Sequence, residues 1–81
     1  MFIVSQDGKH ILNIDCIAEI TTDTPAPCIV AVTKENKNIL LAGYDPKDRH
    51  ILAKELADCM RSMAEKETMY VFPAYTPSKN K

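Results

Sequence analysis

The chain has 81 residues, and its ten Lys and Arg side chains nearly balance eleven Asp and Glu, for a formal net charge of −1. Because the two signs are mixed along the chain, no basic surface for nucleic acid or anionic lipid is indicated. No apolar run approaches the ~20 residues of a membrane span, and the first four residues lack the basic flank of a signal peptide. We therefore expect a cytoplasmic protein with no membrane partner and no direct contact with nucleic acid.

A chain of this length forms one domain. We place that domain at residues 1–73 and expect residues 74–81, which are rich in Pro, Ser, Thr, Asn and Lys, to form a flexible C-terminal tail. So small a domain buries a modest share of its surface, and its stability is marginal unless it associates.

Short apolar segments between turn residues predict strands in the first half of the chain. Asp7-Gly8 predicts a hairpin with a type I′ turn. Asn13 and Asp15 favour side chain–backbone hydrogen bonds, which predict a tight corner such as a 3₁₀ turn. Two prolines make residues 23–27 a loop. The predicted strands are residues 2–5, 10–13, 17–22, 28–33 and 38–43.

Residues 45–65 have the pattern of one amphipathic helix, with Asp45 as its cap and Pro46 at its first position. A final strand follows at about 68–72 and ends at Pro73. Together these elements predict an α+β fold. We expect a curved antiparallel sheet of five or six short strands, with the helix packed on one face.

At about 100° per residue, the predicted helix has one narrow apolar stripe that we expect to face the core. Glu55 and Ser62 fall on the opposite, polar side. Arg49 falls on the apolar side, where its aliphatic stem can pack while its charged end reaches water. The stripe consists of Leu52, Leu56, Cys59 and Met63, widened on one side by Ala53, Ala57 and Met60.

The two central predicted strands are apolar on both faces. Side chains alternate along a strand, so Val30 and Ile29 point to opposite faces, and residues 38–43 repeat this pattern. One helix can cover only one face, and about four bare side chains would cost about 1.5–3 kcal/mol each. The other face is covered by curling of the sheet, by a second copy of the chain, or by a partner protein or apolar ligand.

We expect curling combined with homodimerisation. The candidate interface residues are Ile29, Val30, Ala31, Leu40, Ala42 and Tyr44.

We expect no enzyme, no cofactor and no metal site, because the sequence contains no converging set of reactive groups. His50 lacks a metal-ligating partner four residues later, and His10 lies in a predicted strand. With two glycines, the chain has no phosphate-binding loop. Cys16, Cys28 and Cys59 are odd in number and form no C-x-x-C motif, which is typical of reduced thiols.

Tyr70 and Phe72 lie two residues apart, on one face of the last predicted strand. Such a pair can stack nucleic-acid bases. Base stacking usually accompanies a cluster of Lys and Arg side chains, which is absent around these two residues. We therefore expect both rings to belong to the core.

Residues 2–9, the corner at residues 11–15 and the ending Tyr70-Val71-Phe72-Pro73 resemble a group of short bacterial proteins with no assigned activity, from Gram-positive bacteria of gut type. The resemblance covers residues 1–73 and implies no activity and no binding residue. More distantly, the order of strands and helix is similar to a pleckstrin-homology-like roll, in which a C-terminal helix plugs a curved sheet. This chain has fewer strands than that roll, and it adds a strand after the helix.

The sequence favours a non-enzymatic interaction or assembly module, which we expect to be a homodimer. Its partner is then a second copy of itself or another protein. The alternative is a small regulatory protein that acts by protein contact in a nucleic-acid-handling or phage-type system.

Overall fold

The computed structural model describes residues 1–23 and 26–76. The α+β class and the order of strands and helix are confirmed, but the strands form two three-stranded sheets, β2-β1-β6 and β3-β4-β5, rather than one curved sheet. Residues 77–81 of the predicted tail and 24–25 of the predicted loop lie outside the described residues. The elements are β1 (Phe2–Val4), β2 (Ile11–Asn13), the 3₁₀ turn η1 (Ile14–Cys16), β3 (Ile17–Asp23), β4 (Cys28–Thr33), β5 (Asn38–Gly43), the 3₁₀ turn η2 (Pro46–Asp48), α1 (Arg49–Ala64) and β6 (Met69–Val71).

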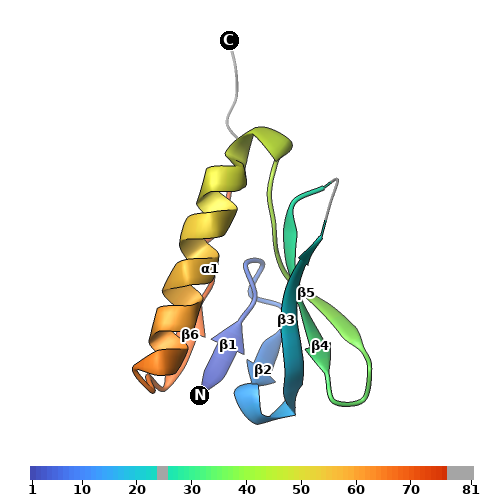
Figure 1. Ribbon diagram of the computed structural model, residues 1–81, viewed down its shortest axis with the longest axis vertical. Helices are drawn as coiled ribbons and strands as arrows, with labels where there is room; N and C mark the ends of the chain where they lie inside the picture. The colour runs from blue at the N-terminus through green and yellow to red at the C-terminus, as the bar shows by residue number, and fades with distance from the viewer. Residues whose placement is uncertain (24–25, 77–81) are drawn as a thin grey trace.

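The molecule has two layers (Figure 1). One layer is the antiparallel sheet β3-β4-β5, and the other consists of α1 with β6, β1 and β2 beside it. The inner face of β3-β4-β5 is therefore covered partly by the helix and partly by the smaller sheet. The buried apolar core between the layers consists of Ile3, Ile29, Ala31, Leu41, Ala42, Tyr44, Cys59 and Phe72.

The predicted corner after β2 separates the two sheets. The side chain of Asn13 accepts a hydrogen bond of 2.9 Å from the Asp15 N–H, and the chain turns through η1 into β3. Strand β3 consequently pairs with β4 and not with β2. The smaller sheet is completed by β6, which pairs parallel to β1. Parallel neighbours cannot be joined by a tight turn, so the other strands and the helix all lie between them in sequence.

The hairpin at Asp7-Gly8 is confirmed by the antiparallel pairing of β1 with β2, but its turn is not type I′. Gly8 has φ +75° and Asp7 does not have a positive φ, whereas a type I′ turn requires both. Instead, the Asp7 carboxylate accepts hydrogen bonds from the Ser5 hydroxyl (2.6 Å) and the Lys9 N–H (2.9 Å). The hydrogen bond from Ser5 is the main cause that lowers the pKa of Asp7 below its ordinary value.

The helix begins later than predicted. Its predicted apolar stripe does pack on the core, because Cys59 is buried and Leu52, Leu56 and Met63 lie against it, but the buried side extends beyond that stripe. Residues 46–48 form η2, and the Asp45 side chain makes no capping hydrogen bond. The buried helix residues are Glu55, Cys59 and Ser62, although two of these were expected on the polar side. The flank that includes Met60 is left exposed. Glu55 is buried for a long-range reason, because its carboxyl group accepts a hydrogen bond from the buried Tyr44 hydroxyl.

Candidate interaction surfaces

Four of the six predicted interface residues lie in the core of the chain itself. They belong to the inner face of β3-β4-β5 or to the segment after it, which α1 and the smaller sheet cover. Their side chains are buried within the chain's own core and are therefore not part of its exposed surface. These residues are Ile29, Ala31, Ala42 and Tyr44, each at most 7 % exposed.

The other two, Val30 and Leu40, lie opposite each other on β4 and β5 and point to the outer face of this sheet. Leu40 is 55 % exposed, and Val30 is half-buried. Their neighbours on the same face include Thr21 beside Val30 and, one pair further along, Glu19 and Asn38 on either side of Val32. A mixture of apolar and polar side chains is ordinary for a sheet face in water.

The smaller sheet has an outer face that is much more apolar. Ile3, Leu12 and Tyr70 point from its strands towards the core, so the alternate residues point outward. On that side Phe2 lies between Asn13 and Met69, and Val4 lies between Ile11 and Val71. We call these six residues the small-sheet face: Phe2, Val4, Ile11, Asn13, Met69 and Val71.

Large apolar side chains are concentrated on the small-sheet face. Exposed fractions are 47 % for Phe2, 67 % for Ile11, and 52 % each for Met69 and Val71. Four of the six exposed large apolar side chains among the described residues therefore lie on this one face, and none of its six members is charged. The sequence feature that could have revealed this face is that residues 2–4 and 69–71 are uninterrupted apolar or aromatic runs. Because side chains alternate along a strand, such a run is apolar on both faces.

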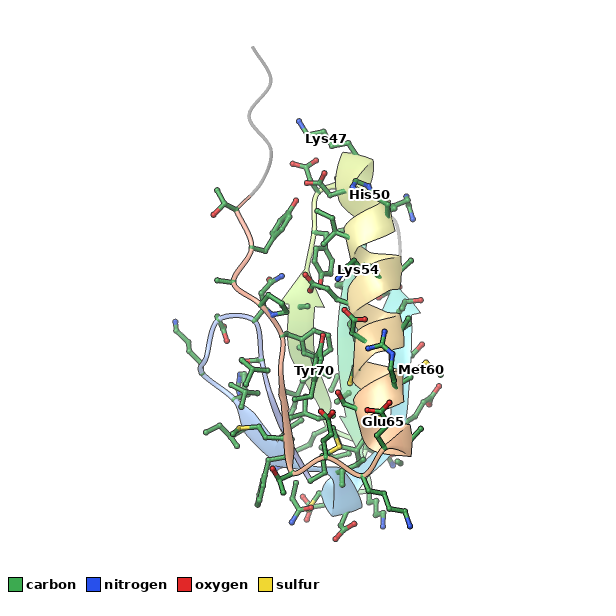
Figure 2. The ribbon with its side chains drawn as sticks, turned by 90° about the vertical axis from the view of Figure 1, so that its left-hand side faces the viewer. Lys47, His50, Lys54, Met60, Glu65 and Tyr70 are labelled. Atoms are coloured by element: carbon green, nitrogen blue, oxygen red, sulfur yellow. The ribbon has the colours of Figure 1, made fainter. Side chains whose placement is uncertain are left out.

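A second exposed apolar region lies between α1 and β3. A cavity of about 290 Å³ there has Ile17 and Ile20 on the strand side and Leu56, Met60 and Met63 on the helix side. We call it the α1–β3 groove. Met60 is 59 % exposed, and Figure 2 shows it on the flank of α1 that faces away from Tyr70 and β6.

Three tyrosines and two carboxyl groups form the main buried polar cluster, at the end of the core near the start of α1. Tyr44 donates a hydrogen bond to the Glu55 carboxyl group. Tyr75 donates to Asp48 at 2.5 Å, and the Asp45 N–H donates to the Tyr75 hydroxyl at 2.9 Å.

The cluster joins the segment after β6 to the helix. The Tyr70 hydroxyl donates to the backbone oxygen of Glu55 at 3.3 Å, and the rings of Tyr44 and Tyr75 meet edge to face at 5.1 Å. Because these hydroxyls are all hydrogen-bonded within the fold, we interpret the cluster as structural. Tyr75 belongs to the segment predicted as a tail, and it contacts Tyr44, Asp45 and Asp48.

Burial raises the pKa of the Tyr44 hydroxyl well above its ordinary range, and the Glu55 carboxyl group adds to that shift. Burial also raises the pKa of Tyr70 to about 12. The neutral phenols are thus favoured by the fold. The contribution of these two phenols to the free energy of unfolding is complete below their ordinary pKa of 10.0. It is lost as the pH rises through the higher pKa values that they have in the folded chain.

We therefore expect the free energy of unfolding to decline above about pH 10, the ordinary tyrosine value. Urea unfolding between pH 8 and pH 12 measures this. Tyr44→Phe removes one of the titrating groups, so its decline with pH should be shallower than that of the wild type. If the urea concentration at the midpoint of wild-type unfolding stays constant to pH 12, this interpretation is contradicted.

The remaining reactive side chains are separated from one another. Burial raises the pKa of Cys59 to about 11, which makes its thiolate scarce at neutral pH. Cys16 is exposed and Cys28 half-buried, and all three thiols are free. Within residues 1–23 and 26–76, no three His, Cys, Asp or Glu side chains gather as a metal ion would require.

None of the helices in the described part of the chain is long and apolar enough to cross a membrane. Comparison with protein-family models, curated proteins and solved structures gave no match.

Proposed function

We propose that this chain is a non-enzymatic assembly module that associates with a second copy of itself through the small-sheet face. The observation that carries the proposal is the set of five apolar side chains and Asn13 on one exposed sheet face. An exposed apolar patch without charges is typical of the centre of a protein–protein contact.

A second copy is the favoured partner because the face carries no charge. Two such sheets can pack face to face at about 10 Å. A twofold axis then brings the same patch of both copies together, so Ile11, Val4 and Val71 of one copy contact apolar side chains of the other. An apolar patch is complementary to itself, whereas a charged patch would need a partner of opposite sign.

Ile11→Asp tests this proposal. Ile11 lies on an edge strand and is 67 % exposed, so the isolated chain should tolerate the change, whereas the contact would have to bury a carboxylate. We expect light scattering to show a molar mass at most half that of the wild type. Val71→Asp, which alters another strand of the same face, should have the same effect.

The matched control is Leu40→Asp, at a similarly exposed apolar residue (55 %) on the outer face of the other sheet. We expect it to leave the molar mass unchanged. If both small-sheet variants keep the wild-type mass, the proposed contact is wrong. If only Leu40→Asp reduces the mass, the contact lies on β4 and β5 instead.

A further inference from the structure

The two layers of the molecule separate along β3. Helix α1 packs more closely on β4 and on β6 than on β3, and the α1–β3 groove, with a volume of about 290 Å³, lies in the resulting gap. Among its lining residues, Ile17, Ile20, Leu56 and Met63 contact the buried core but remain partly exposed. The groove is therefore the open side of the core itself.

A bulge in β3 shapes the strand side of this groove. The pairing register with β4 shifts between Ile17 and Glu19, so Ala18 lies outside the regular ladder. The consecutive residues 17–20 all line the groove, whereas a regular strand would present alternate residues to one side. A bulge also interrupts the row of edge N–H and C=O groups that another strand would need. The geometry of β3 therefore favours a ligand between strand and helix over an added strand.

The volume of the groove sets the size of that ligand. A helix with its side chains is about 10 Å wide, so a segment 10 Å long occupies roughly 800 Å³, far more than the groove can hold. An apolar cavity of about 150 Å³ holds one benzene molecule. About twice that volume accommodates a hydrocarbon group of roughly ten carbon atoms.

The side chains of the groove are suited to such a group. Apart from Glu19, the lining residues in the described part of the chain are apolar, and small-molecule sites are mostly apolar with a few polar groups that fix orientation. Met60 and Met63 form part of the helix side. Their unbranched, polarizable side chains adapt to the shape of an apolar ligand.

The charge at the groove favours one kind of polar end on the ligand. Glu19 is exposed, so its carboxylate lies at the mouth of the groove rather than on its floor. Neither Lys nor Arg occurs among the described residues that line it. A carboxylate or phosphate on the ligand would be repelled by Glu19, whereas a positively charged end would be attracted.

We propose that the α1–β3 groove binds a small amphiphile with a positive charge. Its hydrocarbon group, of about ten carbon atoms, lies between α1 and β3, and its charged end lies at Glu19. The small-sheet face contributes no residue to this site, so binding does not depend on the contact between copies proposed above.

Decyltrimethylammonium and decanoate, each below its critical micelle concentration, test the charge at the site by isothermal titration calorimetry. We expect the wild type to bind one decyltrimethylammonium per chain, about two- to fivefold more tightly than decanoate, which is the size of effect of an exposed ion pair. Glu19→Lys should reverse this preference. The matched control is Glu35→Lys, an exposed residue outside the groove, which makes the same change in net charge and should keep the wild-type preference.

Ala18→Trp tests the place of binding, because it adds an indole ring to the strand side of the groove. Displacement of about two CH₂ groups from the groove weakens binding about tenfold, so we expect at least this loss for decyltrimethylammonium. Ala74→Trp is the matched control, at an exposed alanine after β6 and outside the groove, and should bind as the wild type does. Circular dichroism establishes that each variant is folded.

The proposal is wrong if the wild type binds neither probe, if Ala18→Trp binds like the wild type, or if Glu19→Lys keeps the wild-type preference. Ile11→Asp alters the small-sheet face and leaves the groove intact, so this variant should still bind decyltrimethylammonium. Loss of binding in Ile11→Asp would place the probe on the small-sheet face and overturn the proposal. The molar mass of the same variant tests the contact between copies separately.

Discussion

Replacement of Phe72 by Ala is expected to lower the free energy of unfolding by about 3–5 kcal/mol. Phe72 is the largest fully buried side chain in the described residues, at 1 % exposure. Its ring packs edge to face on Tyr70 with 5.0 Å between centroids. Its N–H also donates to the Val4 carbonyl at 3.0 Å. It therefore fixes the segment after β6 to both the core and the smaller sheet.

For a small domain, this loss is a large share of a total stability of about 5–15 kcal/mol. Urea unfolding measures it, and the control is Leu40→Ala, at a 55 % exposed apolar residue outside the small-sheet face. The control should lose less than about 1 kcal/mol in the monomeric state, because little buried area disappears. A loss below about 1.5 kcal/mol for Phe72→Ala would show that the segment after β6 does not complete the core.

Local chemistry made some elements of the fold predictable. The corner after β2 depends on the Asn13 side chain and the Asp15 N–H, which are two residues apart. The hairpin at Asp7-Gly8 and the helix around residues 49–64 are equally local. The division into two sheets is different, because it depends on parallel pairing of residues 2–4 with residues 69–71. No feature within either segment specifies that partner.

The apolar stripe predicted which side of α1 packs on the core, but not that the buried side extends to Glu55 and Ser62. Periodicity placed Glu55 and Ser62 in water, since a carboxyl group is buried only with a partner. That partner is the hydroxyl of Tyr44, which comes from the segment after β5. The buried side of α1 thus includes Glu55, on the flank away from Met60, and Met60 is 59 % exposed.

The apolar character of both faces of β4 and β5 does not by itself reveal where exposed apolar side chains gather. Strands β4 and β5 are apolar on both faces, but on their outer face polar side chains of β3 and of Asn38 lie beside the apolar ones. The shorter strands at residues 2–4 and 69–71 have the same two-sided pattern, and β6 and β2 flank β1 with further apolar side chains. Only the pairing of these strands shows that their apolar sides coincide.

Tyr44→Phe is expected to lower the free energy of unfolding by about 2 kcal/mol or more, because a buried carboxyl group that loses its donor pays a desolvation penalty. Glu55 is 8 % exposed, and water cannot easily replace the Tyr44 hydroxyl. Urea unfolding at pH 7 measures the loss. Tyr70→Phe is the matched control. Its hydroxyl donates to a backbone carbonyl at 3.3 Å, so its removal should cost about 1 kcal/mol or less.

A double-mutant cycle separates the hydrogen bond from other effects of the substitution. If the stabilisation comes from pairing the Tyr44 hydroxyl with the Glu55 carboxyl group, Tyr44→Phe/Glu55→Leu should lose clearly less than the sum of the two single variants, because the second change removes the unpaired carboxyl group. We expect a coupling energy of about 1–3 kcal/mol. Additive losses would mean that the two groups stabilise the fold independently. The burial of Glu55 would then need a cause other than this hydrogen bond.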